Sequence, residues 1–137
     1  MSFSSEIAHF WRSGVECSRI DFPLTVTGPQ GEAGCSFRFD TGCDITMVSE
    51  DVATALGLPS GGRPITVAGS TGTAAGRLVP VIFRFPPDEI SGLPEAEVFS
   101  MWIVTGARTQ LALVGLQDVH AHFAVGTDDT YMYFTNR

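Results

Sequence analysis

The sequence predicts an all-β fold. The chain has 137 residues, among them 15 glycines and 8 prolines, and these stand between short runs of β-branched and aromatic residues. Such spacing is typical of many short strands joined by frequent turns. The length fits one domain, which is large enough to bury a hydrophobic core. Only one or two short helical stretches interrupt this pattern.

The net charge, the hydropathy and the cysteine count limit the classes of partner and the compartment that we expect. A formal net charge of −7 with only 8 basic residues argues against a nucleic-acid partner, because phosphates attract clustered Lys and Arg. No apolar run is long enough for a membrane span, and the first residues lack a signal-peptide pattern. The 3 cysteines fit reduced thiols better than a disulfide framework. We therefore expect a cytoplasmic protein with no membrane partner.

The first twenty residues are ambiguous. Ile7, Phe10 and Trp11 stand at i, i+3 and i+4, the spacing of an amphipathic helix. We therefore expect residues 1–20 to be a separate N-terminal segment, with a short helix as one reading of it, and residues 21–137 to be the β domain. The segment could pack on that domain or against a second subunit.

From residue 20 the pattern changes to period two. Phe22, Leu24 and Val26 alternate with polar residues, which predicts a first strand. Residues 28–31 read Gly-Pro-Gln-Gly and predict a turn. Residues 33–40 then return as the partner strand of a hairpin.

The second strand ends on Asp40, and Thr41 and Gly42 follow it. A carboxylate in an apolar setting loses hydration unless it is hydrogen-bonded or changes its pKa. Asp40 is therefore either structurally paired or chemically used. Cys43 lies close by, but no base partner is evident, so we expect a small buried thiol there.

The rest of the chain continues the β pattern. Ser49 can cap a short helix that ends at Gly57. Strand-like runs then flank a small-residue tip over residues 69–72, which predicts a long hairpin. Residues 85–94 are rich in proline and acid and predict a surface loop.

Three further stretches complete the chain. Residues 98–104 and 111–115 predict buried strands. The tail, residues 131–137, predicts a strand that pairs either with another chain or within its own domain.

The Asp40-Thr41-Gly42 stretch, the apolar strand before it and the apolar run that closes on Gly115 together resemble the retropepsin-like aspartic peptidases. The resemblance implies a closed small β-barrel in which each subunit of a homodimer supplies one aspartate, and a short helix over residues 116–123, after Gly115. It further implies that Asp40 is catalytic, that Thr41 locks the two loops together and that Gly42 allows close backbone approach.

The same resemblance implies a substrate site for a peptide or protein. The hairpin at residues 69–72 would be the flap, with Gly69, Ser70, Thr71 and Gly72 at its tip. Asp44 would contact the substrate ends. No cofactor is implied, and neither the histidines nor the cysteines show the spacing of a metal site.

One departure from the family bears on activity. The family often has Arg after the glycine of the second signature, where this chain has Leu116, and Asp or Asn next, where it has Gln117. Asp44 would therefore lack its usual Arg partner. Two readings stay open beside the aspartic endopeptidase: a non-catalytic dimeric or peptide-binding module, and a monomeric β-barrel that binds a small ligand.

Overall fold

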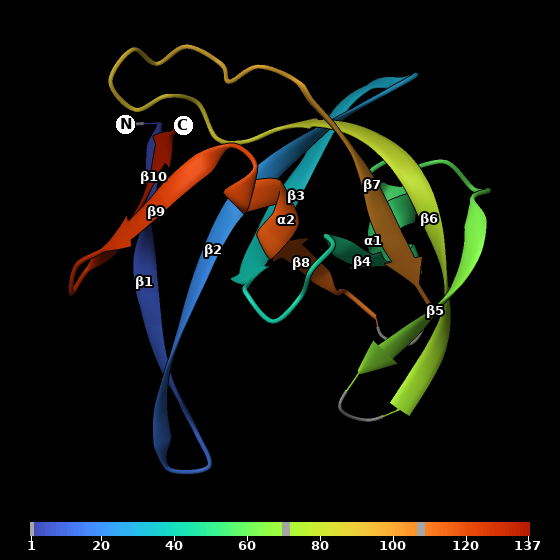
Figure 1. Cartoon of the computed structure of the whole chain (residues 1–137), viewed down its shortest axis with the longest axis horizontal. Coiled ribbons are helices and arrows are strands. Elements are labelled where there is room, and N and C mark those ends of the chain that lie inside the picture. The colour runs from blue at the N-terminus through green and yellow to red at the C-terminus, as the bar shows by residue number, and fades with distance from the viewer. Residues whose placement is uncertain (1, 70–71, 107–108) are drawn as a thin grey trace.

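The computed structural model describes residues 2–69, 72–106 and 109–137, and Figure 1 shows its strands wrapped around a common core. The strands are β1 (Phe3–Arg12), β2 (Val15–Gly28), β3 (Gly31–Asp40), β4 (Met47–Ser49), β5 (Arg63–Gly69), β6 (Gly72–Arg84), β7 (Val98–Thr105), β8 (Ala112–Gly115), β9 (Phe123–Thr127) and β10 (Tyr131–Asn136). The two helices, α1 (Glu50–Ala55) and α2 (Leu116–His120), are short. The all-β prediction is confirmed.

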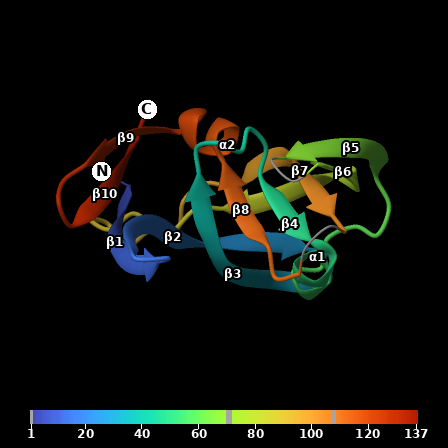
Figure 2. The ribbon, with the colours of Figure 1, turned by 90° about the horizontal axis from the view of Figure 1, so that it is seen from below.

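The strands form a closed ring. The order runs β2, β3, β8, β4, β7, β6, and the pairing of β6 with β2 closes it. The β3/β8 and β4/β7 pairs are parallel, and the others in the ring are antiparallel. Figure 2 shows the central strands β3, β8 and β4 side by side. The ring fixes the end of β3, and thus Asp40, next to β8.

The core fills this ring. Phe37, Val48, Trp102 and Val114 have essentially no exposed surface, and each comes from a different ring strand. The predicted alternation along β2 is confirmed, since Phe22, Leu24 and Val26 are all buried. Side chains of successive strand residues point to opposite faces, so one face of each strand supplies the core.

The helix considered for residues 1–20 is wrong. Phe3–Arg12 form strand β1, which pairs with β10 over its first half and with β2 over its second half. In a strand, the side chains of Phe10 and Trp11 point to opposite sides. The two residues therefore do not form the shared apolar face that a helix would give them. Strand β2 runs through residue 20, across the boundary that the sequence predicted. Long-range pairing outweighs a short local periodicity here.

The tail pairs within its own chain. Strand β10 lies between β1 and β9, so both of its edges are used, and β9 forms the end of the sheet order. The predicted helix after Gly115 is shorter than expected, because Phe123 already begins β9.

The loop predicted at residues 85–94 carries no helix or strand, although Phe85 is buried. It is held against β1, because Ser4 donates from its backbone N–H and its hydroxyl to the Glu89 carboxylate. In the described part of the chain, no helix has the length and apolar character that crossing a membrane requires.

Candidate functional site

Asp40 stands at the end of β3, where the chain turns tightly. The backbone N–H of Gly42 donates to Oδ1 of Asp40 at 2.9 Å, and the N–H of Cys43 donates to the Asp40 carbonyl at 3.1 Å. Asp40 as a whole residue is half-buried. The turn therefore orients one carboxyl oxygen and leaves the second free of this contact.

The loop after Asp40 is held by β8 and α2. Asp40 is paired in register with Gly115. The first backbone N–H groups of α2 then donate to the loop, from Leu116 to the Cys43 carbonyl at 2.8 Å and from Gln117 to the Asp44 carbonyl at 3.1 Å. These N–H groups have no partner within a helix, so the loop carbonyls satisfy them.

Gly115 allows this close approach. A Cβ atom at this position would lie 2.6 Å from the carbonyl carbon of Ile45 and 2.7 Å from the backbone nitrogen of Thr46. Any larger residue would push the loop away from β8. The glycine of the second sequence signature is thus explained by backbone contact with the Asp40 loop.

A buried polar cluster lies behind the loop. The Thr46 hydroxyl donates to Asp118 Oδ2 at 2.6 Å, and the Ser100 hydroxyl donates to Oδ1 at 2.6 Å. The Gly115 N–H in turn donates to the Thr46 hydroxyl at 3.0 Å. Asp118 is only 7% exposed. We call Thr46, Ser100 and Asp118 the Asp118 cluster; it connects α2, β7 and the Asp40 loop.

Sequence reasoning assigned no role to Asp118. Its signal was weak: an acid in a short helix, next to the buried Val119. Its position on the inner side of α2 becomes clear only when the helix is placed against the ring.

Asp44 lacks the arginine that the resemblance implies. Leu116 is 40% exposed, and no ion pair involves Asp44 among the residues that the structure describes. The Asp44 backbone carbonyl is nevertheless fixed by Gln117. Backbone hydrogen bonds from α2 therefore fix the position of the loop at Asp44 in the absence of a side-chain ion pair within the described residues.

Cys43 is not a nucleophile in this arrangement. Its thiol donates to the Ile45 carbonyl at 2.8 Å. Burial, the largest cause, and the nearby Asp40 carboxylate both raise the pKa of the Cys43 thiol. A thiol with a raised pKa is mostly protonated at neutral pH and reacts poorly.

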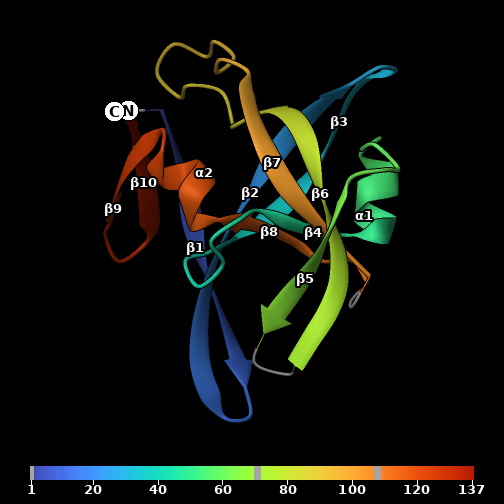
Figure 3. The ribbon, with the colours of Figure 1, turned by 45° about the vertical axis from the view of Figure 1, so that its right-hand side comes forward.

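The predicted flap is a hairpin of β5 and β6. The register ends at the pair of Gly69 with Gly72, so these two predicted residues stand at its end. Ser70 and Thr71 lie outside the described residues. Figure 3 shows the hairpin extending past the loop that follows β3.

A cleft of about 370 Å³ separates the hairpin from the Asp40 loop. The loop side is lined by Gly42, Cys43, Asp44 and Ile45, the hairpin side by Thr66, Val67 and Ala68, and the floor by Met47, Ile103 and Leu113. The predicted residues Gly42 and Asp44 therefore share one cleft, with Asp40 directly beside Gly42. The floor is apolar, and Cys43, Asp44 and Thr66 give the walls their polar side chains.

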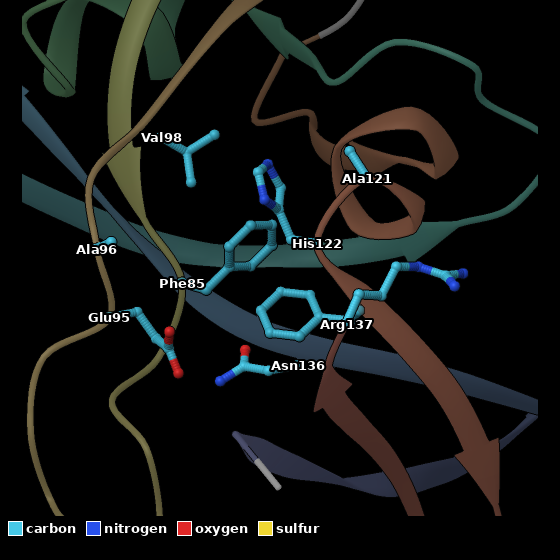
Figure 4. A pocket seen from close by; sticks show the side chains of 9 residues that line it. Phe85, Glu95, Ala96, Val98, Ala121, His122, Asn136 and Arg137 are labelled. Atoms are coloured by element: carbon cyan, nitrogen blue, oxygen red, sulfur yellow. The ribbon is translucent and has the colours of Figure 1, made fainter.

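A second pocket lies at the other end of α2 (Figure 4). The ring of Phe85 and the imidazole of His122 lie next to each other there, with centres 6.1 Å apart and planes tilted by 56°, and Glu95, Asn136 and Arg137 stand around them. None of the predicted site residues lines it. His120 and His122 belong to this region, and no group of potential metal ligands occurs in the described part of the chain.

Comparison with known proteins points to one family. A sequence profile described as aspartyl protease matches residues 22–118, which is more than half of the chain. The search of curated protein sequences found no match to this chain. Among solved structures, a crystal structure of a retropepsin-like aspartic protease from Rickettsia conorii is similar with a TM-score of 0.58 at 13% identity, over 98% of this chain and 93% of that chain. At this identity the likeness concerns the fold.

Proposed function

Because the chain belongs to the aspartyl protease family, we propose that it is an aspartic endopeptidase whose active unit is a homodimer. The observation that carries the proposal is the setting of Asp40. It ends a core strand, accepts a hydrogen bond from Gly42 at 2.9 Å and stands beside a cleft roofed by the β5/β6 hairpin. The chain has a single Asp-Thr-Gly sequence, so the second carboxylate comes from a second copy.

The mechanism needs two carboxyl groups that share one proton. Like charges at close range cannot both ionise, so one group of the pair stays protonated. The ionised Asp40 takes a proton from the water that attacks the scissile carbonyl. The protonated Asp40 donates a hydrogen bond to the oxyanion that develops.

The neighbouring residues position these groups. The Gly42 N–H holds Oδ1 of Asp40, which keeps the carboxyl plane fixed while the proton moves. Thr41 joins the two loops by hydrogen bonds across the symmetry axis. Asp44 and the hairpin end at Gly69 and Gly72, with Ser70 and Thr71 between them, hold an extended peptide in the cleft. An extended peptide can form main-chain hydrogen bonds with an exposed strand edge, such as that of the hairpin.

The decisive experiment replaces Asp40→Asn and measures cleavage of an unfolded protein from acidic to neutral pH. We expect a fall in kcat on the order of a thousandfold or more, because the shared proton and the base are both lost. A matched control is Asp129→Asn, an exposed aspartate in the turn between β9 and β10, which leaves cleavage unchanged. Equal cleavage by the Asp40→Asn protein and the parent would exclude this function.

The second candidate is a dimeric peptide-binding module without turnover. It is favoured by the loss of the family arginine at Leu116 and by the absence of an ion pair to Asp44 within the described residues. It predicts that peptides bind in the cleft and stay intact. Turnover that is blocked by a statine-type transition-state analogue would exclude it.

A further inference from the structure

The first two strands extend into an arm. Residues 3–6 of β1 pair with β10, and residues 21–28 of β2 pair with β3. Between these stretches, residues 7–12 and 15–20 pair with each other, from Ile7 with Ile20 to Arg12 with Val15. We call residues 7–20 the β1–β2 arm. Figure 1 shows it projecting beyond the ring of strands.

The turn of the arm is a tight one. Ser13 and Gly14 have φ angles of 52° and 77°, the left-handed pair that suits a two-residue hairpin turn. The arm is thus an ordered hairpin with a defined tip.

One side of the arm continues the core. Directly opposed residues of an antiparallel pair point to the same side, and the sides alternate along the strand. The pairs on this side are Ile7 with Ile20, His9 with Ser18, and Trp11 with Glu16. At the root, Ile20 is 7% exposed and Ile7 packs partly against the core. Towards the tip, Trp11 on the same side is 71% exposed.

The other side of the arm is covered differently. Arg12 and Arg19 lie over the ring of Phe10, with their guanidinium carbons 5.6 and 5.7 Å from its centre. Phe10 therefore has cation–π partners within the arm. Among the described residues no cation lies over the ring of Trp11, and its side of the arm extends past the core that would bury it.

The arm extends on the same side of the molecule as the loop after Asp40, where the proposed homodimer needs its second subunit. In Figures 1 and 3 the arm and the β5/β6 hairpin extend in the same direction, and in Figure 1 the loop that follows β3 stands between them. Asp40 ends β3 directly before that loop. In the proposed homodimer, the second Asp40 approaches from the side of the molecule to which the arm and the hairpin extend. Two further apolar side chains are exposed at the loop, Ile45 at 37% and Leu116 at 40%.

We propose that the β1–β2 arm of each subunit packs its Trp11 side onto a second copy of this chain, beside the paired Asp40 loops. This inference rests on the proposed homodimer and adds the surface that holds it together. An aromatic side chain of this size buries 150–250 Å², and tryptophan is among the residues that dominate interface energies. The centre of this contact is the apolar ring of Trp11, in keeping with Leu116 where the family often carries an arginine, and His9, Glu16 and Ser18 on the same side of the arm surround it with polar groups.

The first test replaces Trp11→Thr, which keeps a residue with good strand propensity. Sedimentation over a range of protein concentrations measures the dimer dissociation constant, and we expect it to rise at least tenfold. The matched control is Phe99→Thr, since Phe99 is also an aromatic residue on a strand and is 68% exposed. The control should leave the dissociation constant unchanged.

Folding is checked separately. Because Trp11 contacts little of its own chain, thermal unfolding at dilutions where the parent is monomeric should give the same Tm for the Trp11→Thr variant and the parent. A lowered Tm would assign Trp11 to the monomer fold and overturn the proposal.

A second test measures proximity. Cys17, Cys35 and Cys43 are replaced by Ser, and Trp11→Cys is then labelled with a benzophenone. Irradiation should give a product of twice the subunit mass, and the same label at Phe99→Cys should not. Labelling at position 11 without any such product would overturn the arm contact.

The outcomes separate this inference from the proposed function. If Trp11→Thr dimerises like the parent and Asp40-dependent cleavage persists, the arm is excluded and the peptidase stands. If Trp11→Thr weakens the dimer but Asp40→Asn cleaves like the parent, the peptidase is excluded and the arm stands. If the parent protein stays monomeric at all concentrations, both the arm contact and the homodimeric peptidase are excluded.

Discussion

The two walls of the cleft are built in opposite ways. The Asp40 loop is fixed from behind by hydrogen bonds from Leu116 and Gln117, by contact with Gly115 and by the Asp118 cluster. The facing hairpin is tied to the ring only at its root, since β6 pairs with β7 from Gly76 onwards. Residues 66–69 pair with residues 72–75 rather than with the ring.

This contrast separates two tasks. Chemistry on a shared proton requires carboxyl groups held in one position, because a small misplacement costs much of the rate. Closing over an extended peptide requires a wall that can adjust, and elements with few buried contacts open at low cost. Substitutions behind the loop should therefore change stability and kcat, and substitutions at the hairpin root should have small effects.

The largest effect is expected for Gly115→Ala. The added Cβ meets the backbone of Ile45 and Thr46 at 2.6 and 2.7 Å, and backbone atoms cannot rotate away as a side chain can. We expect a loss of roughly 3 kcal/mol in the free energy of unfolding, typical of an overpacked core, together with a fall in kcat. Urea denaturation measures the first and peptide cleavage the second.

Gly126→Ala is the control for this substitution. A Cβ at Gly126 in β9 meets nothing within 4 Å, so the unfolding free energy should stay close to that of the parent. Equal effects of the two substitutions would show that the Asp40 loop is not held by close packing on β8.

A smaller loss is expected for Thr46→Val in the Asp118 cluster. Thr46 is fully buried, and valine has the same shape without the hydroxyl. Asp118 Oδ2 and the Gly115 N–H then lose their partner, which should cost about 2 kcal/mol. Thr46→Ser keeps the hydroxyl and should retain most of that stability. If Val and Ser at this position denature alike, the hydrogen bonds of the cluster contribute nothing.

The turn at Asp40 could be predicted from the sequence, but the Asp118 cluster that supports it could not. The turn at Asp40 follows from local signals, because a period-two strand ends on a carboxylate and a glycine follows. The α1 helix was likewise predicted from its neighbours: Ser49 stands at the N-cap position, although its side chain makes no capping hydrogen bond, and Gly57, with φ of 73°, follows the end of the helix. These features depend on residues close together in the chain.

The Asp118 cluster depends on residues far apart. Thr46 and Asp118 are separated by 72 positions, and nothing in either local stretch shows that they meet. The β1–β2 arm was missed for a different reason, because its pairs, from Arg12 with Val15 to Ile7 with Ile20, all lie close together in the chain. The spacing of Ile7, Phe10 and Trp11 also fits a helix, and that local pattern predicts a helix rather than a hairpin.

The smallest effect is expected at the root of the hairpin. Arg77 of β6 forms an ion pair with Glu50 of α1 at 3.0 Å and also donates to the carbonyls of Pro59 and Gly61. The hydrogen bond from Arg77, the largest cause, lowers the pKa of Glu50 below its usual 4.5. The Glu50 side chain is 54% exposed, so solvent screens most of this interaction.

Glu50→Gln should therefore lower the unfolding free energy at pH 7 by only a few tenths of a kcal/mol. A carboxyl group whose pKa is lowered by folding stabilises the protein above its unfolded pKa, and this contribution disappears as the pH falls through the lowered value. The difference between variant and parent should thus vanish in acid, as urea denaturation at pH 7 and near pH 3 can measure. Glu6→Gln is the control, because Glu6 forms no ion pair within the described residues. A loss at Glu50→Gln as large as that of Thr46→Val would mean that the hairpin root is anchored as firmly as the Asp40 loop, and the two walls would no longer differ.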